Sequence, residues 1–131
     1  MAELHEILYC STLAPDQTPN VVAQIVSQAR ARNSERGITG LLVFDGLNFC
    51  QHLEGPARDV IRLIDRIAQD PRHTAVRVIY EGVRAAPRYE RFDLGFAEVE
   101  GPDGLTELFG LDDEAALARF LAMRPRFDVS G

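Results

Sequence analysis

Two polar side chains, the phenol of Tyr9 and the carboxamide of Gln51, stand in otherwise apolar segments of the sequence. Glutamine is found mostly at protein surfaces, and a polar group that is buried needs a hydrogen-bond partner. A carboxamide offers both donors and an acceptor, so it can satisfy a buried phenol, and its rotation would exchange the two ends. From the residues alone, the preferred interpretation is a structural hydrogen bond that fixes the register of two strands.

Other chemistries have little support in the sequence. The three histidines (His5, His52 and His73) are scattered, and no pair of cysteine or histidine residues has metal-ligand spacing. The glycine-rich phosphate loops and the nucleophile elbow of hydrolases are missing as well. Cys10 and Cys50 are interpreted as reduced, small apolar core residues rather than as a disulfide. Metal, phosphate-loop and serine-hydrolase chemistry are therefore not expected.

Length and charge narrow the class of protein further. A chain of 131 residues is the size of one domain. The formal net charge is -6, and the sequence contains no run of basic residues. Neither nucleic acid nor an anionic membrane is therefore an expected partner. No apolar run is longer than that of residues 41–44, which is far short of a membrane span. The first residues lack the pattern of a signal peptide, and the sequence thus predicts a soluble cytoplasmic protein.

The periodicity of apolar residues predicts five strands and three helices. The expected strands cover residues 4–11, 40–44, 47–53, 76–83 and 92–99. The first helix is expected to begin at Thr18 and Pro19, a capping hydroxyl followed by proline, and to stop before Gly37. The other helices are expected over residues 57–69 and 112–123, the latter with Asp112 as its N-cap.

This order, β-α-β-β-α-β-β with a helical tail, predicts an α+β fold of ferredoxin-like type. In that topology the first and third strands lie side by side in the centre of a mixed five-stranded sheet, and both helices cover one face. Tyr9 and Gln51 are then candidates for neighbouring positions, while Cys10 and His52 point to the opposite face. One short tail helix covers only part of that face, so a second subunit, most simply in a two-fold dimer, is expected to contribute.

Five stretches of the sequence resemble the signature motifs of the BLUF family, flavin-based sensors of blue light. They are residues 7–11 (ILYCS), 33–42 (NSERGITGLL), 49–55 (FCQHLEG), 70–73 (DPRH) and 88–95 (RYERFDLG). The similarity runs without large gaps from about residue 4 to residue 99. The family's ferredoxin-like fold agrees with the order of elements predicted above.

The resemblance implies a flavin between the two helices: FAD, with FMN and riboflavin as alternatives. Tyr9 matches the photoactive tyrosine of the family and Gln51 its switching glutamine, whose rearrangement after electron and proton transfer from the tyrosine shifts flavin absorption to the red. The other matching positions are the flavin-binding residues Ile25, Arg32, Asn33, Arg66, Ile67, Asp70 and Arg72. Arg32 stands where many members carry asparagine or histidine.

The last predicted strand departs from the family. Its usual tryptophan and methionine are replaced by Phe92 and Leu94, and the chain has no tryptophan. A signal that depends on an indole therefore cannot operate here in that form. We expect a sensor domain over residues 1–100 and a helical extension over residues 101–131. Because no output domain follows, the receptor is expected to have no enzymatic turnover and to act on a separate protein partner.

Two alternatives remain open from the sequence. One is a flavin-free ferredoxin-like module for binding or oligomerisation, which stays open because of the missing tryptophan and of Arg32. The other is a small enzyme of acylphosphatase type on the same fold, which would need a phosphate-cradling glycine loop near the first strand that this chain does not have. The colour of the purified protein separates them from a flavin sensor.

Overall fold

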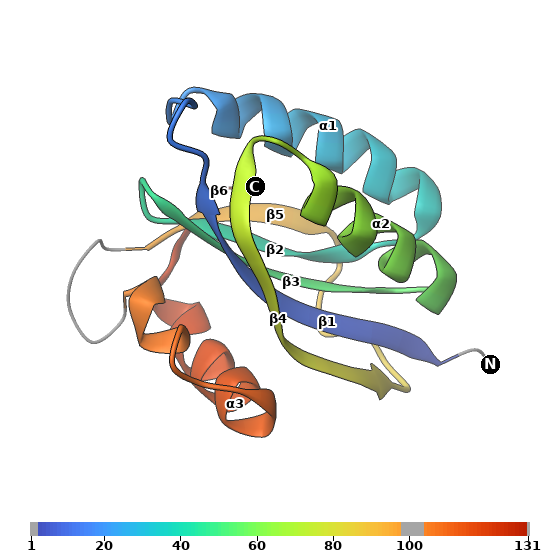
Figure 1. Ribbon diagram of the computed structural model, residues 1–131. Helices are drawn as coiled ribbons and strands as arrows, with labels where there is room; N and C mark the ends of the chain where they lie inside the picture. Colours follow the sequence, from blue (N-terminus) through green and yellow to red (C-terminus); the bar gives the residue numbers. More distant parts are fainter. Residues whose placement is uncertain (1–2, 98–103, 131) are drawn as a thin grey trace.

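The computed structural model describes residues 3–97 and 104–130 as a sheet with helices on both faces (Figure 1). The elements in chain order are β1 (Leu4–Leu13), α1 (Val21–Arg36), β2 (Thr39–Phe44), β3 (Asn48–Gly55), α2 (Ala57–Gln69), β4 (His73–Arg84), β5 (Phe92–Phe96), the 3₁₀ helix η1 (Leu105–Leu108), α3 (Asp113–Met123), the 3₁₀ helix η2 (Arg124–Arg126) and β6 (Asp128–Ser130).

The sheet has the order β4-β1-β3-β2-β5-β6. β1 pairs antiparallel with both β3 and β4, and β2 pairs antiparallel with β3 and parallel with β5. The first and third strands are therefore neighbours in the interior of the sheet, and the predicted ferredoxin-like arrangement is confirmed. The number of strands is corrected from five to six, because the end of the described chain returns and adds β6 to the outer edge of β5.

Several element boundaries differ from the sequence prediction. α1 begins at Val21, because Thr18 and Pro19 instead form the turn before the helix, in which the carbonyl groups of both residues accept backbone hydrogen bonds. The predicted stop before Gly37 is confirmed, and Gly37 has the left-handed conformation that favours glycine after a helix. β4 starts three residues earlier than expected, at His73. The predicted end of β5 and the break that follows it fall on residues 98–103, outside the described residues.

The alternation of side chains along the strands divides the core into two layers. The layer between the sheet and the helices α1 and α2 holds Tyr9, Phe49 and Leu53. The layer on the other face holds Leu8, Cys10 and Cys50. The predicted faces of β1 and β3 are thus confirmed, and the two cysteines lie on the face away from α1 and α2.

The second layer is covered by the C-terminal segment, here defined as residues 104–130 (Figure 1). Its residues Leu105, Leu108, Phe120 and Met123 are completely buried against the sheet. The segment is also tied to β4, where the Arg77 guanidinium donates to the carbonyl oxygen of Phe109 and pairs with Asp112. The same chain therefore supplies this cover, whereas the sequence predicted that a second subunit would contribute to it.

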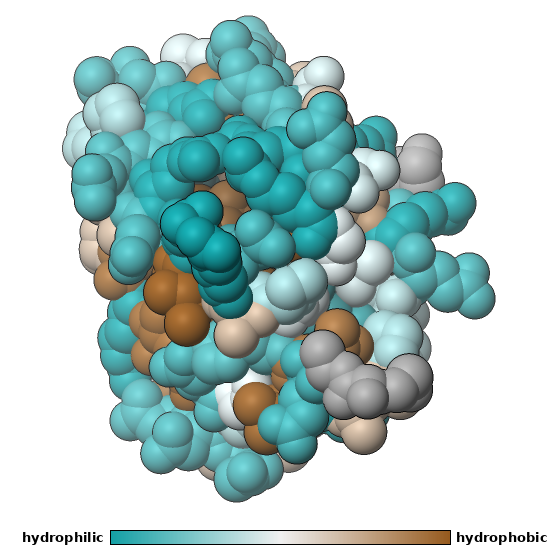
Figure 2. All heavy atoms as spheres, turned by 90° about the vertical axis from the view of Figure 1, so that its right-hand side faces the viewer, coloured by the Kyte–Doolittle hydropathy of each residue, from teal (hydrophilic) through white to brown (hydrophobic). Residues whose placement is uncertain are grey.

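The outer surface is mainly hydrophilic on the side that Figure 2 shows, with hydrophobic side chains gathered in separate small patches. The exposed large hydrophobic residues include Val78 and Val83 of the edge strand β4, at 41% and 60% exposure. No helix within the described ranges is both long and apolar enough to cross a membrane.

Candidate functional site

Tyr9 and Gln51 face each other directly across the two central strands. They are register partners of β1 and β3, and the Tyr9 hydroxyl donates a hydrogen bond to Gln51 Oε1. Both side chains are buried, with 1% and 4% exposure. Burial raises the pKa of the Tyr9 phenol far above its ordinary value, because a tyrosinate in this apolar layer would lose its hydration. The pair predicted from the sequence is therefore present, and its phenol is held in the neutral form.

A pocket of about 110 Å³ opens between α1, α2 and the central strands, beside this pair. The predicted residues that line it are Tyr9, Ile25, Arg32, Asn33, Gln51, Arg66, Ile67, Asp70 and Arg72. The structure thus gathers into one pocket residues that lie up to 63 positions apart in the sequence. His73, the last residue of the fourth motif, also lines it. The remaining lining residues are Ala29, Leu42 and Leu63, which the sequence reasoning did not assign to a site.

Two of these additional residues lie next to predicted site residues. Ala29 precedes Asn33 by four residues on α1, so both side chains lie on one face of the helix. Leu42 is the register partner of Gln51 on β2, which places it next to the glutamine on the same face of the sheet. The periodicity identified all three as apolar positions, and only the presence of a cavity distinguishes them from other core residues.

Asn33 is the most informative residue in the pocket. Its side chain is buried at 1% exposure, and neither its amide nitrogen nor its amide oxygen has a hydrogen-bond partner among the described residues. Asn33 does not cap α1, because the helix continues to Arg36 and its C-cap is Gly37. A buried amide left unpaired costs about 1–3 kcal/mol per group. The pocket therefore suits a ligand with both a donor and an acceptor on its edge, as a flavin ring has.

Charged groups gather at one end of the pocket. The Arg72 guanidinium lies 2.7 Å from Asp70 Oδ2 and also donates to Gln28. Burial alone would raise the pKa of the Asp70 carboxyl, but its hydrogen bonds from Arg72 lower it below its usual value. Burial lowers the pKa of the Arg32 guanidinium, and the positive charge of Arg66 lowers it further. Arg32, Arg66 and Arg72 all line the pocket beside a single carboxylate, Asp70, so this end is positive and suited to an anionic group.

His73 forms part of the pocket wall at the beginning of β4. Its Nδ1 lies 3.0 Å from Ser11 Oγ, and its ring packs against Phe49 with 4.7 Å between centroids. Burial lowers the pKa of this imidazole, and it outweighs the opposing effect of nearby Asp70. His73 is therefore held as a neutral hydrogen-bonding group.

Phe92 and Leu94 of β5 do not line this pocket. Leu94 is the register partner of Leu42, and Leu42 is in turn the partner of Gln51. A row of paired positions thus runs from Tyr9 through Gln51 and Leu42 to Leu94. The predicted signalling strand is connected to the pocket through β2, not by direct contact with the glutamine.

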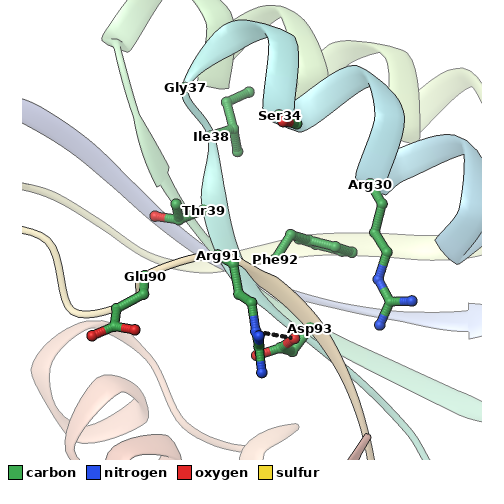
Figure 3. Close-up of a pocket in the computed structure, with 9 residues that line it drawn as sticks. All are labelled: Arg30, Ser34, Gly37, Ile38, Thr39, Glu90, Arg91, Phe92 and Asp93. Atoms are coloured by element: carbon green, nitrogen blue, oxygen red, sulfur yellow. Dashed lines mark hydrogen bonds and ion pairs between the residues drawn. The ribbon is translucent and has the colours of Figure 1, made fainter. Parts of the chain in front are cut away.

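A second cavity, of about 540 Å³, lies between the end of α1 and the beginning of β5 (Figure 3). Phe92 forms part of its wall, and Arg91 and Asp93 stand beside one another at its edge, joined by an ion pair of 3.0 Å. Glu90 adds another carboxylate. The charges at this cavity largely compensate one another, in contrast to the positive end of the first pocket.

A buried polar network lies behind Gln51, on the opposite face of the sheet. His52 is completely buried, with Nε2 at 2.6 Å from Glu6 Oε1 and Nδ1 at 2.6 Å from the Tyr89 hydroxyl. Burial raises the pKa of Tyr89 to about 12. The ring of His52 also meets the edge of Phe120 in α3. His52 is therefore held by contacts from three separate segments of the chain.

Glu54 belongs to the same face and anchors a loop. One carboxylate oxygen accepts hydrogen bonds from the backbone N–H groups of Arg88 and Tyr89 and from the Thr39 hydroxyl. This carboxylate therefore holds the segment before β5 against β3. In the part of the chain that the structure describes, no cluster of three acidic, histidine or cysteine residues is arranged to hold a metal ion.

The fold and the pocket together define a ferredoxin-like domain with a small, polar-edged ligand site between two helices. Residues 4–95 match the family model described as "Sensors of blue-light using FAD" (BLUF). The chain therefore belongs to the BLUF family of blue-light flavin sensors.

Individual relatives support this assignment. The "Blue light- and temperature-regulated antirepressor BluF" of Escherichia coli (strain K12) is 34% identical over 100 residues, which cover 72% of this chain and 25% of that protein. The "Photoactivated adenylate cyclase subunit beta" of Euglena gracilis is 41% identical over 70 residues, 53% of this chain and 8% of that one. The chain thus spans a quarter or less of these two curated relatives.

Solved structures show the same similarity. The structure titled "BlrP1 BLUF" is 30% identical with a TM-score of 0.68, and the match covers 86% of this chain and 78% of that one. "Klebsiella pneumoniae BlrP1 with FMN and cyclic diGMP" is 32% identical with a TM-score of 0.67, covering 79% and 28%. "BlsA photo-activated state", at 21% identity and a TM-score of 0.74 with coverage of 91% and 92%, supports the fold alone.

Proposed function

We propose that this chain is a blue-light photoreceptor that holds a flavin in the pocket between α1 and α2 and signals to a separate protein. The observation that carries the proposal is the unpaired, buried amide of Asn33 in the same pocket as the Tyr9–Gln51 pair. If the tyrosine–glutamine hydrogen bond were only structural, nothing would explain why a buried position without a hydrogen-bond partner carries an asparagine. A ring with hydrogen-bonding edges accounts for both features.

The pocket residues divide by chemistry. Asn33 offers a donor and an acceptor to the edge of the flavin ring. Ile25 and Ile67 line the pocket from the two helices and would pack on the faces of the ring. The charged end of the pocket suits the phosphate group of a flavin nucleotide, because it carries Arg32, Arg66 and Arg72. Asp70 holds Arg72 in place. We propose FAD as the flavin, in keeping with the description of the family, and FMN is the alternative because it accompanies the Klebsiella structure.

When bound, the flavin absorbs blue light and becomes a strong oxidant. Tyr9 is the group placed to give up an electron, and its raised pKa opposes the loss of a proton on its own. Loss of the electron makes the phenol proton acidic, and that proton leaves along the existing hydrogen bond toward Gln51 Oε1. If the Gln51 oxygen takes this proton while its N–H group gives one up to the reduced acceptor, the amide becomes its imidic acid tautomer, whose donor and acceptor ends are exchanged. Because this change is small, the signal depends on how the side chains packed around Gln51 rearrange in response.

The row from Gln51 through Leu42 to Leu94 is the proposed route to the signalling strand. The side chains of Phe92 and Leu94 have no N–H group, so the signal passes as a change in side-chain packing. We further propose that residues 1–100 form the sensor and residues 101–131 its extension. The protein is proposed to be cytoplasmic. It is also proposed to have no catalytic turnover of its own. Its downstream partner would then be a separate protein.

Illumination of the purified protein tests the central proposal. The protein should be yellow, and blue light should shift its flavin band slightly and reversibly to the red. Tyr9→Phe should keep the flavin and lose the shift, because the ring remains while the hydroxyl is removed. Tyr80→Phe is the matched control, since Tyr80 lies on the opposite face of the sheet and should leave the shift intact. A normal shift in Tyr9→Phe would contradict the assignment, and a colourless protein would favour the flavin-free module.

Gln51→Leu tests the other half of the pair. The variant should bind flavin but lose the signalling shift, because leucine has neither a donor nor an acceptor to exchange. Gln69→Leu at the exposed end of α2 is the control for the change of residue type. A full light-induced shift in Gln51→Leu would point to a different relay.

We also propose a homodimer. The C-terminal segment covers the second core layer, so that sheet face is not free to bind a second subunit. The proposed dimer interface is instead the edge strand β4, where Val78 and Val83 are exposed. An edge strand with apolar side chains is prone to pair with another chain. Light scattering coupled to size exclusion, in darkness and under blue light, measures the mass directly. A strict monomer at high concentration would contradict the dimer.

A further inference from the structure

Cys10 and Cys50 form a cross-strand pair in the centre of the sheet. They are register partners on β1 and β3, and their Sγ atoms are 3.6 Å apart. Both are free thiols, and they are the only two cysteines of the sequence. Each therefore has a single candidate for a disulfide within the chain.

The backbone pattern shows that this pair occupies a site suited to a disulfide. The N–H group of Leu13 donates to the carbonyl oxygen of Leu47, its register partner by continuation of the β1–β3 ladder. Leu13 and Leu47 are therefore a hydrogen-bonded pair. Hydrogen-bonded and non-hydrogen-bonded pairs alternate along an antiparallel ladder, and Cys10 and Cys50 lie three pairs away, so they are a non-hydrogen-bonded pair. Their Cα atoms in this arrangement are about 4.5 Å apart, at the short end of the range of about 4.4–6.8 Å found in disulfides.

The sulfurs are close enough that rotation of the side chains, without a shift of either strand, could join them. The β1–β3 register continues without a bulge on both sides of the pair. Closing the gap from 3.6 Å to the S–S bond length of about 2.05 Å is a movement of the scale that a change of χ1 provides. No backbone rearrangement is needed for the bond itself.

Access to the thiols is controlled by the C-terminal segment. Cys10 is 5% exposed and Cys50 is completely buried, in the layer that Leu105, Leu108 and Phe120 cover. Burial raises the pKa of the Cys50 thiol, and a covered thiol in apolar surroundings is unreactive. A peroxide would therefore reach the pair far more readily once the C-terminal segment leaves the sheet.

We propose that Cys10 and Cys50 are a reversible disulfide site, oxidised by a peroxide when the C-terminal segment undocks from the sheet. Cys10, the more exposed thiol, attacks a peroxide oxygen, the O–O bond breaks and one water leaves, which gives a sulfenic acid. The Cys50 sulfur then displaces the hydroxyl, which departs as a second water with the remaining thiol proton. Two thiols and one hydrogen peroxide thus yield one disulfide and two waters, and an external dithiol reverses the change.

The position of the bond gives it a consequence for the site. Tyr9 directly precedes Cys10, and Gln51 directly follows Cys50. A disulfide would tie the two strands together one residue away from the Tyr9–Gln51 pair. This inference does not depend on the bound flavin, because the thiols lie on the other face of the sheet.

Oxidation of the native protein tests the proposal. The protein is incubated with hydrogen peroxide, the remaining thiols are alkylated, and intact mass and cross-linked peptides are measured. We expect the mass to fall by two hydrogen atoms, a cross-linked peptide pair containing Cys10 and Cys50, and reversal by dithiothreitol. Cys10→Ser and Cys50→Ser should lose the cross-link. Irreversible oxidation of one thiol, disulfide-linked oligomers or two persistent thiols in the native wild type would each overturn the proposal.

The role of the C-terminal segment has its own variant. Phe120→Ala weakens the packing of the segment on the sheet, so the disulfide should form at least about tenfold faster than in the wild type. Leu47→Ala is the control, because Leu47 is 56% exposed and is not part of the core layer that the segment covers. Equal rates of disulfide formation in Phe120→Ala and the wild type would overturn the proposed control of access by the C-terminal segment.

Discussion

His52 and Glu6 form a completely buried pair, with 2.6 Å between His52 Nε2 and Glu6 Oε1. A second pair of the same residue types and the same separation, His5 and Glu81, lies at the surface. The chain thus contains a matched comparison of one interaction in two environments. Glu6 also accepts a hydrogen bond from Arg88, so its loss would leave two polar groups without their partner.

Glu6→Ala should therefore lower the free energy of unfolding by about 3–5 kcal/mol, the usual result of removing one member of a buried pair. Glu81→Ala should change it by no more than about 1 kcal/mol, because solvent screens the exposed pair. Denaturant unfolding of both variants beside the wild type measures the difference. Equal losses would show that burial does not set the contribution of the Glu6–His52 pair.

Acid should destabilise the fold through His73. Its pKa is lowered from 6.5 by burial, so below pH 6.5 the unfolded chain takes up a proton that the folded chain does not. The stabilisation is complete above pH 6.5 and is lost as the pH falls toward the lower, folded pKa. Denaturant unfolding between pH 7.5 and pH 5 should show this decline, and His73→Gln should flatten it. A decline of the same steepness in the variant would assign it to other groups.

Asn33→Ala should separate ligand binding from folding. Flavin retention should fall about 5- to 150-fold, because the edge of a buried ring loses its partner. The stability of the flavin-free protein should not fall by a comparable amount, since the Asn33 amide has no partner among the described residues. Flavin content across a dilution series and unfolding of the apoprotein give the two measurements, and Ser34→Ala at an exposed neighbour is the control. Unchanged retention in Asn33→Ala would argue against the ligand role.

Gly40 allows a close approach of β2 to β3. A Cβ atom at this position would lie 2.0 Å from the carbonyl oxygen of His52, where no flexible side chain can yield. Gly40→Ala should therefore destabilise the protein by about 3 kcal/mol or more. Gly110→Ala is the matched control, because a Cβ there meets open space. Similar melting temperatures for the two variants would be inconsistent with this steric constraint.

The sequence predicted features that depend on local periodicity and could not predict those that depend on distant partners. The helix over residues 57–69 and the faces of Tyr9 and Cys10 follow from spacing alone, and the structure confirms them. The start of α1 was wrong because Thr18 and Pro19 suit a turn as well as a helix N-terminus.

Long-range pairings left no comparable signal. Glu6 and His52 are 46 residues apart, and nothing in either strand shows that a carboxylate and an imidazole will be aligned across the sheet. β6 has only three residues, too few for any period to be visible. The unpaired state of Asn33 is also a property of the assembled pocket, because it depends on which groups fail to reach the amide.

The short strand β6 makes the outer edge of β5 a site of competition. Its three residues pair with Leu94, Gly95 and Phe96, the same backbone groups that a strand from another protein would need. Because β6 is tethered to the sheet, it acts as an internal ligand at high effective concentration. Any extended peptide that recognises this edge must displace it, so the affinity measured for such a peptide would be an exchange constant, lower than the intrinsic affinity of the exposed strand.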